Sequence, residues 1–262
     1  MSRIKRLKEM IKASSKTTST VYVILRILVI FCMIREIVNG NFQNALLCVL
    51  SLILFLMPFL VEKTFKIDLP VILEVIIFAF IFSAEILGEI NNFYGTIPFW
   101  DSVLHTINGF LAASVGFSLI YLLNENIESF NLSPIFVSIF AFCFSMTIGI
   151  VWEFFEYSMD KYFNFDMQKD TYVNKINTVE LDPKKDNNVI TIDDIEYTIS
   201  YDKDNKELVK IKGYLDIGLE DTIKDLWVNF IGATVYSIFG YLYILNKEKY
   251  KIAGKFITKK SK

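Results

Sequence analysis

Histidine, cysteine and proline are all scarce in this sequence of 262 residues. It contains one histidine, five prolines and three cysteines, and the cysteines lie inside apolar stretches with no CxxC spacing. Cysteines of this kind are typical of small buried hydrophobic residues, so we predict neither a disulfide framework nor a cysteine metal site. Basic charge is not in excess either, because the formal net charge is −2. We therefore expect no nucleic-acid partner.

Hydrophobic residues are abundant, at 53% of the chain, and they include 24 phenylalanines. This fraction is high for a soluble domain and is typical of a protein that crosses a membrane several times. Six segments approach or exceed the ~20 residues that a helix needs to span a bilayer. They are 21–38, 42–61, 69–90, 100–123, 134–157 and 222–245. We predict an all-α polytopic membrane protein, built as a six-helix transmembrane bundle with a small extracytoplasmic β insert.

The distribution of lysine and arginine predicts the orientation of the spans. Basic residues precede the first span, occur between the second and third, and follow the sixth, whereas 39–41 and 91–99 contain none. Because cytoplasmic flanks carry the basic excess, we expect both termini to be cytoplasmic and the protein to lie in the inner (plasma) membrane. The chain then divides into a basic amphipathic segment (1–20), five spans (21–157), an outer polar insert (158–220), the sixth span (221–245) and a basic cytoplasmic tail (246–262).

The polar insert 158–220 contains a strand pattern. Apolar and polar residues alternate over 195–201, and the turn-like sequence 202–205 leads into a second such run at 207–212. This pattern predicts an antiparallel β hairpin or a three-stranded sheet, resting on the outer ends of the helices.

Ionisable residues occur in pairs at the predicted outer ends of four spans. Helical spacing of three or four residues places the two members of each pair on one helix face. The pairs are Glu85 and Glu89, Asp101 and His105, Glu153 and Glu156, and Asp221 and Asp225. Ionisable groups in membrane segments are costly and usually mark functional sites. We therefore predict that the four pairs converge in one polar cup near the outer membrane surface.

Two kinds of chemistry would neutralise such a cup. Carboxylates with one imidazole suit a divalent metal such as Mg or Mn, whereas shared protons would make the cup a proton or cation relay. The metal ligands that we predict are Glu156, Asp221, Asp225 and Glu85, and the predicted catalytic residues are His105, Asp101 and Glu153. In this hypothesis His105 or Glu153 is the general base and Asp101 orients the histidine.

Plainer interpretations of single positions stay open. Glu89 can lie in headgroup water, Asp221 and Asp225 can cap the sixth span, and His105 can be a structural histidine bonded to Asp101. The depth shared by all eight positions favours a common site.

Three separated motifs resemble a known family. They are Asp101-x-x-x-His105-x-x-x-Gly109, Glu153-x-x-Glu156, and Asp221-Thr222-x-x-Asp225 followed by Gly232-Ala233. In this order they resemble the YjdF family of inner-membrane proteins. The resemblance implies no particular activity, because no biochemical activity is established for that family. The run Asp225-x-x-x-Asn229-x-x-Gly232-Ala233 also looks like the VanZ-like membrane proteins, which are associated with glycopeptide resistance and the outer envelope. The resemblance implies that the acids and the histidine of these motifs form one site, and the insert is longer than either family leads us to expect.

The leading functional hypothesis is a membrane protein whose outer polar site acts on a lipid or lipid-linked envelope component, with membrane lipids as its surroundings. A transporter that uses the same carboxylates as a relay is the first alternative. A non-catalytic scaffold or sensor, whose insert binds a partner, is the second.

Overall fold

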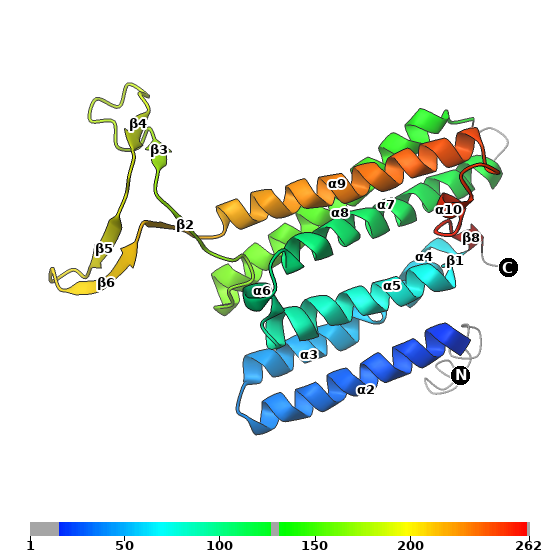
Figure 1. The fold of residues 1–262 in the computed structure, drawn as a ribbon, viewed down its shortest axis with the longest axis horizontal. Helices are drawn as coiled ribbons and strands as arrows, with labels where there is room; N and C mark the ends of the chain where they lie inside the picture. Colours follow the sequence, from blue (N-terminus) through cyan, green and yellow to red (C-terminus); the bar gives the residue numbers. More distant parts are fainter. Residues whose placement is uncertain (1–15, 127–130, 261–262) are drawn as a thin grey trace. The chain divides into compact units, whose positions relative to one another are not determined.

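The computed structural model describes residues 16–126 and 131–260. The chain divides into two units, one formed by residues 1–150 and 225–262 and the other by residues 151–224. Figure 1 shows the long helices and the short strands of the described chain. Most of the predicted basic segment 1–20 lies outside the described residues.

Each predicted span corresponds to helical structure. The first three are α2 (Lys16–Val38), α3 (Phe42–Leu54) continued by α4 (Met57–Phe65), and α5 (Val71–Ile81) continued by the π-helix η1 (Phe82–Ile90). The last three are α7 (Trp100–Asn126), α8 (Pro134–Phe163) and α9 (Leu219–Leu245), and two short helices, α6 (Phe93–Thr96) and α10 (Lys251–Gly254), lie outside them.

Five helical segments of the described chain are long and apolar enough to cross a membrane. They are Phe42–Phe65, Val71–Ile90, Trp100–Glu125, Pro134–Phe163 and Leu219–Leu245. Helix α2 is not among them, and it carries the charged residues Arg26, Arg35 and Glu36. A multi-pass helical protein is thus supported, whereas the predicted count of six spans is not confirmed.

The helices of the first unit pack around two main groups of buried residues. One group joins α7, α8 and α9 and includes Phe117, Val137 and Tyr236, all of which are fully buried. The other joins α2, α3, α5 and η1 and includes Val29 and Phe55. Many large apolar side chains point outward instead, as expected for helices whose outer faces meet lipid tails.

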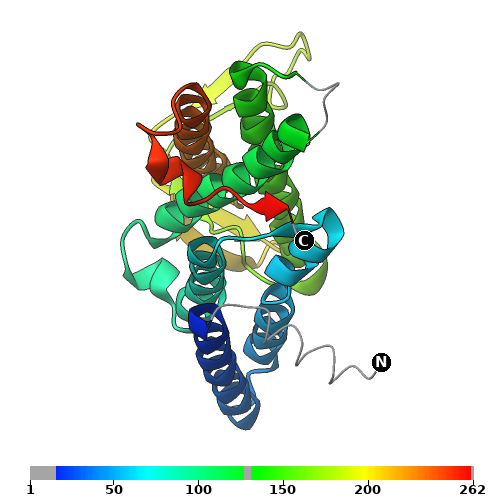
Figure 2. The same ribbon diagram turned by 90° about the vertical axis from the view of Figure 1, so that its right-hand side faces the viewer.

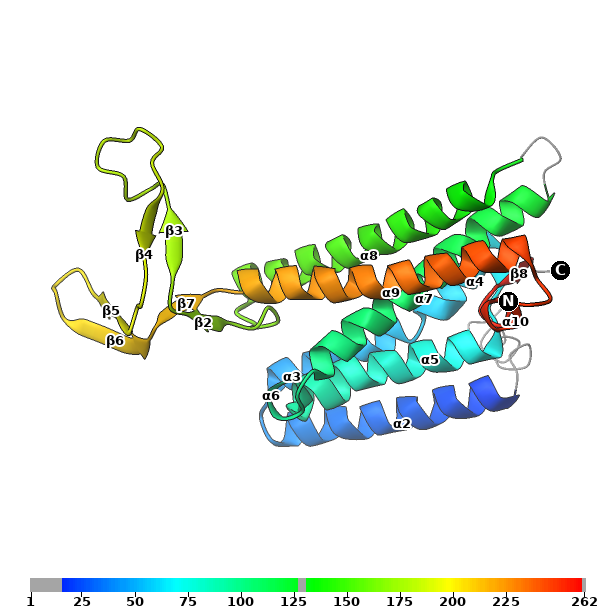
Figure 3. The ribbon, with the colours of Figure 1, turned by 45° about the horizontal axis from the view of Figure 1, so that its top comes forward.

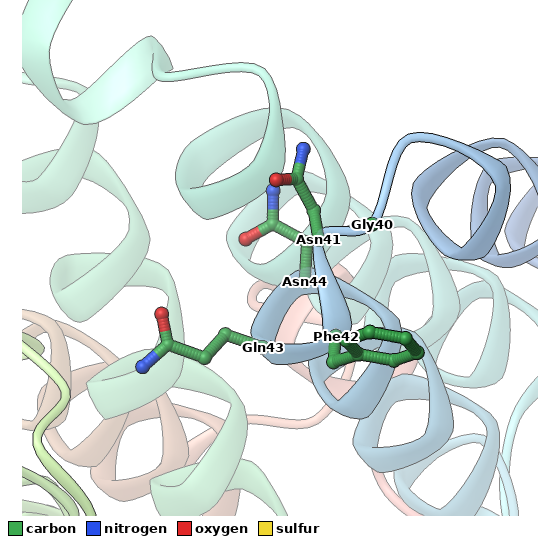
Figure 4. A pocket seen from close by; sticks show the side chains of 5 residues that line it. All are labelled: Gly40, Asn41, Phe42, Gln43 and Asn44. Carbon is green, nitrogen blue, oxygen red and sulfur yellow. The ribbon is translucent and has the colours of Figure 1, made fainter.

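Glu36 fastens the turn between α2 and α3. Its carboxylate is only 4% exposed and accepts hydrogen bonds from Arg35 Nε at 2.7 Å and from Asn41 Nδ2 and Asn44 Nδ2 at 3.1 Å. Figure 4 shows the pocket that surrounds these amides, and it is lined by Gly40, Asn41, Phe42, Gln43 and Asn44. Because three donors bind this carboxylate, Glu36 serves to close the α2–α3 hairpin.

The C-terminal segment, which belongs to the first unit, folds back against its helices, as Figure 2 shows for α10 and β8 (Lys259–Lys260). The Phe256 ring lies 5.2 Å from the Phe110 ring in an edge-on arrangement. The backbone N–H of Thr258 donates to Ser118 Oγ at 3.0 Å. Strand β8 then pairs antiparallel with β1 (Ile67–Asp68). The predicted tail 246–262 is therefore packed against the helices over residues 251–260.

The second unit holds six short strands, drawn in Figure 3. They are β2 (Thr171–Val173), β3 (Ile176–Thr178), β4 (Ile190–Ile192), β5 (Tyr197–Tyr201), β6 (Glu207–Lys212) and β7 (Tyr214–Asp216). They form three antiparallel pairs, β2–β7, β3–β4 and β5–β6. The predicted hairpin at 195–212 is thus present as β5–β6, and a three-stranded sheet is not formed among the described residues.

Two side chains order the turns of this insert. Asp202 Oδ1 accepts the backbone N–H groups of Asp204 and Lys206 in the β5–β6 turn. Asp182 accepts the N–H groups of Lys184, Asp186 and Asn188 in the connection between β3 and β4. Acidic side chains are favoured in such turns because they bind nearby backbone N–H groups.

Candidate metal centre

Helix α7 presents Asp101 and His105 on one face, one turn apart. Trp100 begins this helix, and its indole N–H donates to the carbonyl of Ser83 in η1 at 3.3 Å. Asp101 lies in the first turn, where the helix dipole favours a negative charge. His105 Nε2 lies 3.4 Å from Asp101 Oδ1. The predicted pairing of these two residues is therefore present.

Helix α9 brings a second carboxylate to the same imidazole. Asp225 Oδ2 lies 3.6 Å from His105 Nε2, and Asp225 is only 2% exposed. One nitrogen or oxygen atom from each of Asp101, His105 and Asp225 lies within 4.8 Å of the other two. We call these three residues the Asp–His–Asp cluster. They come from two helices, and His105 and Asp225 are 120 positions apart in the sequence.

Two glycines explain why α7 and α9 come so close beside the cluster. A Cβ atom at Gly109 would overlap the backbone carbonyl oxygen of Asn229, and one at Gly232 would overlap that of Thr106. The two backbones are therefore in direct contact, which any side chain at these positions would prevent. The small residues of the predicted motifs thus set the distance between His105 and Asp225.

A layer of amides lies one turn further along both helices. Asn108 Nδ2 donates to Asn229 Oδ1 at 3.3 Å, and Asn229 Nδ2 lies 3.5 Å from the sulfur of Met146 in α8. Ser145, also in α8, donates its hydroxyl to the carbonyl of Gly109 at 2.7 Å. Neither asparagine was assigned a catalytic or metal-binding role from the sequence, although Asn229 belongs to the run that looks VanZ-like. Their signal in the sequence is helical spacing, since Asn108 follows His105 by three residues and Asn229 follows Asp225 by four.

Glu85 lies in the π-helix η1 and does not belong to the Asp–His–Asp cluster. It is 3% exposed, and its Oε2 atom has no hydrogen-bond partner among the described residues. π-Helical turns are rare and frequently occur at functional sites. The structure therefore presents Glu85 as a further buried carboxyl group outside the Asp–His–Asp cluster.

The other predicted site residues belong to the second unit and are described within it. Glu153 and Glu156 are both buried, and Glu156 accepts a hydrogen bond from the indole N–H of Trp152 at 2.8 Å. Asp221 Oδ2 accepts the backbone N–H of Lys169 at 2.8 Å, and its Oδ1 lies 3.7 Å from Lys224 Nζ. Asp221 thus fastens the chain that leaves α8 toward the insert. Its role as a metal ligand, like that of Glu156, stays a prediction.

The apolar helices and the buried polar cluster define an integral membrane protein with an ionisable site in its helical region. A family model described as "Predicted membrane protein (DUF2238)" matches residues 19–246. The chain therefore belongs to this family of membrane proteins. The predicted YjdF-type relationship is consistent with this membership, whereas the VanZ-like features are not shown by it.

One curated relative also matches part of the chain. A Thermotoga maritima protein, which carries the name "Uncharacterized protein", is 26% identical over 104 residues. These residues make up 40% of this chain and 52% of that protein, so the match spans about half the length of the relative. No solved structure matches the chain.

Proposed function

We propose that this protein is a membrane enzyme that holds a divalent cation at the Asp–His–Asp cluster and acts on a lipid or lipid-linked envelope component. The observation that carries the proposal is the meeting of Asp101, His105 and Asp225 from two apolar helices. Two carboxylates beside one imidazole are expensive to bury unless positive charge compensates them. A bound cation supplies this compensation and also supplies chemistry.

The chemistry of a bound cation suits hydrolysis or group transfer. A metal ion lowers the pKa of a bound water molecule and polarises carbonyl or phosphoryl oxygens. Asp101, His105 and Asp225 would hold the ion in this proposal. From the sequence, His105 or Glu153 is the predicted general base, and this assignment stays a prediction.

The surroundings of the cluster support a lipid-linked substrate. Val103 follows Asp101 by two residues and is 52% exposed, and Trp227 follows Asp225 by two residues and is 63% exposed. Large exposed apolar side chains of membrane helices face lipid tails, and indole rings favour the membrane interface. Two residues along a helix turn the side chain to the opposite face, so Val103 and Trp227 place α7 and α9 against lipid at the depth of the cluster. A substrate anchored by an apolar chain would lie at the same depth. The distribution of basic residues supports an outward-facing site.

Metal analysis combined with lipid profiling tests this proposal. The full chain is purified without a tag in lipid nanodiscs, and a deletion strain is complemented with wild type, His105→Ala, Asp225→Asn or the exposed Asp204→Asn. We expect about one metal ion per chain in wild type and in Asp204→Asn, and less in the two cluster variants. We also expect the deletion to alter envelope lipids, and only wild type and Asp204→Asn to restore them. Metal-free wild type, or an unchanged lipid profile after deletion, would contradict the proposal.

Glu85 supports one second candidate, a proton- or cation-coupled transporter. A carboxyl group buried in a membrane helix, away from the Asp–His–Asp cluster, is the kind of group that relays use. This function predicts ion flux in proteoliposomes that is lost in Glu85→Gln. An enzyme that works at the cluster predicts no such flux.

A further inference from the structure

We propose that the cation held by the Asp–His–Asp cluster is a four-coordinate transition-metal ion of the zinc type, and not magnesium or manganese. This inference deepens the proposed function and rests on it only in using the same three residues. The amino-acid composition of the site alone favours magnesium or manganese, whereas the separations between its ligand atoms fit zinc better.

The two separations from His105 Nε2 are the starting point. They are 3.4 Å to Asp101 Oδ1 and 3.6 Å to Asp225 Oδ2. Bonds of about 2.0–2.2 Å to a tetrahedral zinc ion place neighbouring ligand atoms about 3.3–3.6 Å apart. The two separations from His105 fall in this interval, and the ligand atoms of Asp101 and Asp225 lie within 4.8 Å of each other.

The other common divalent cations fit less well. Octahedral magnesium, with bonds of about 2.0–2.1 Å, places adjacent ligand atoms only about 2.8–3.0 Å apart. Calcium has longer bonds, but it takes six to eight oxygen ligands and no imidazole. Imidazole is instead a preferred ligand of zinc, iron, copper and nickel. Manganese, like magnesium, prefers carboxylate, carbonyl and water oxygens in octahedral geometry. His105 therefore argues for a later transition metal of the zinc type, and the separations argue for four-coordinate geometry.

The helix packing fixes the longer of the two separations. His105 lies on α7 and Asp225 on α9, and the two backbones already touch at Gly109 and Gly232. The helices can move no closer at this level, so an octahedral ion would require both side chains to leave their positions. The hydrogen bond between Asn108 and Asn229 further ties the two helices one turn away.

Charge balance also favours this assignment. A neutral imidazole and two carboxylates around a divalent ion have no net charge, which suits the 2% exposed Asp225 in an apolar helix. Histidine binds metal in its neutral form, so loading the site releases any proton that the imidazole carries.

Cobalt substitution tests the inference directly. The full tag-free chain in detergent is stripped with a chelator and titrated separately with Co²⁺, Zn²⁺ and Mg²⁺. We expect Co²⁺ to give the intense visible absorption of tetrahedral cobalt, Zn²⁺ to abolish it mole for mole, and excess Mg²⁺ to leave it unchanged. In His105→Ala and Asp225→Asn, affinity should fall by more than the ~10–100-fold that outer-shell changes cause. Asp204→Asn should titrate like wild type.

Weak octahedral cobalt bands, displacement by Mg²⁺, or no binding to folded wild type would overturn the inference. Asp101→Asn, which preserves the size and shape of the side chain, is the second variant if His105→Ala does not fold, and far-ultraviolet circular dichroism checks each protein. If the purified protein gives the tetrahedral cobalt spectrum but deletion of its gene leaves the lipid profile unchanged, the proposed reaction is wrong and the zinc-type assignment is kept. If lipid turnover requires Mg²⁺ and no other metal, the zinc-type assignment is wrong and the proposed reaction on lipids is kept.

Discussion

At the scale of single residues, Asp225 is a costly feature, because it is a charged group buried in an apolar helix. Its carboxylate is only 2% exposed, and most residues of its helix are apolar. It lies beside His105, the only histidine of the sequence. The sequence predicted that Asp225 belongs to a site, because it shares a helix face with Asp221. It could not show that Asp225 meets His105 while Asp221 binds the backbone of Lys169, since that choice depends on the path of the insert.

Replacing Asp225 should separate stability from metal binding. Asp225→Leu replaces one of the two carboxylates beside His105 with an apolar side chain. Asp101 stays beside the imidazole, so the change removes a costly buried charge without leaving His105 unpaired. We expect the metal-free variant to melt at or above the temperature of metal-free wild type. Zinc at 100 times its Kd should stabilise wild type by about 2.7 kcal/mol and leave the variant unchanged.

Thermal unfolding in detergent, with and without zinc, measures both effects. Asp204→Asn serves as the control and should respond to zinc as wild type does. A zinc-dependent rise in the melting temperature of Asp225→Leu would show that the ion binds elsewhere.

At the scale of elements, the crossing of α7 and α9 depends on the absence of side chains at Gly109 and Gly232. In Gly232→Ala, the new Cβ would overlap the carbonyl oxygen of Thr106, so the helices must separate. We expect a loss of about 1–3 kcal/mol in the free energy of unfolding, which is typical of overpacked sites. Zinc affinity should fall as well, because the distance between His105 and Asp225 grows.

Denaturant titration and zinc titration measure these two losses. The control is Ile231→Val, a small change at an exposed neighbouring position of the same helix. Full zinc affinity in a folded Gly232→Ala would mean that the crossing does not position the cluster.

The connection between β3 and β4 should respond to acid. Backbone N–H groups of Asn188, Lys184 and Asp186 bind the Asp182 carboxylate and hold its pKa below the ordinary 3.8. A lowered folded-state pKa means that this contribution to stability is complete above the ordinary pKa and disappears as the pH falls through the lowered value. We expect the connection to stay protected at neutral pH and to open only well below pH 4.

Amide hydrogen exchange over residues 182–188 at several pH values tests this expectation. Asp182→Ala should show fast exchange already at neutral pH, whereas Asp204→Asn should not. Opening of wild type at mildly acidic pH would contradict the assigned role of the carboxylate.

At the scale of the whole molecule, sequence patterns located most elements and missed the connections among them. The apolar runs and the alternation at 195–201 predicted the long helices and the β5–β6 hairpin because these patterns arise locally. The packing of residues 251–260 was missed, because a lysine-rich C-terminal segment is typical of a solvated tail. Two contacts hold this segment: Phe256 packs against Phe110, and β8 pairs with β1. Both join residues that are far apart in the sequence.

Two substitutions in the C-terminal segment should differ in their effect on stability. Phe256→Ala removes a ring that packs against Phe110 and Tyr236, and we expect it to lower the free energy of unfolding by about 2 kcal/mol or more. Thr258→Val removes a buried hydroxyl oxygen that has no hydrogen-bond partner among the described residues, so it should be neutral or stabilising. Denaturant unfolding of both variants measures the pair, and equal destabilisation would contradict the packing described for this segment.

The insert should be dispensable for metal binding. Thr171 and Asp216 are opposite each other in the β2–β7 pair, so two glycines can replace residues 172–215. We expect the shortened protein to keep its zinc affinity, because all three residues of the cluster lie in the first unit. If lipid turnover were lost in this variant but kept in His105→Ala, the protein would be a scaffold or sensor that works through its insert.

The pairing of β1 with β8 has a topological consequence. Backbone hydrogen bonds between Ile67–Asp68 and Lys259–Lys260 require the α4–α5 connection and the end of the chain to emerge into the same aqueous compartment. Four membrane-spanning segments lie between the two strands, and an even number of passes returns the polypeptide to the compartment it left. A reporter at either strand therefore reveals the sidedness of both, whether or not α2 is inserted.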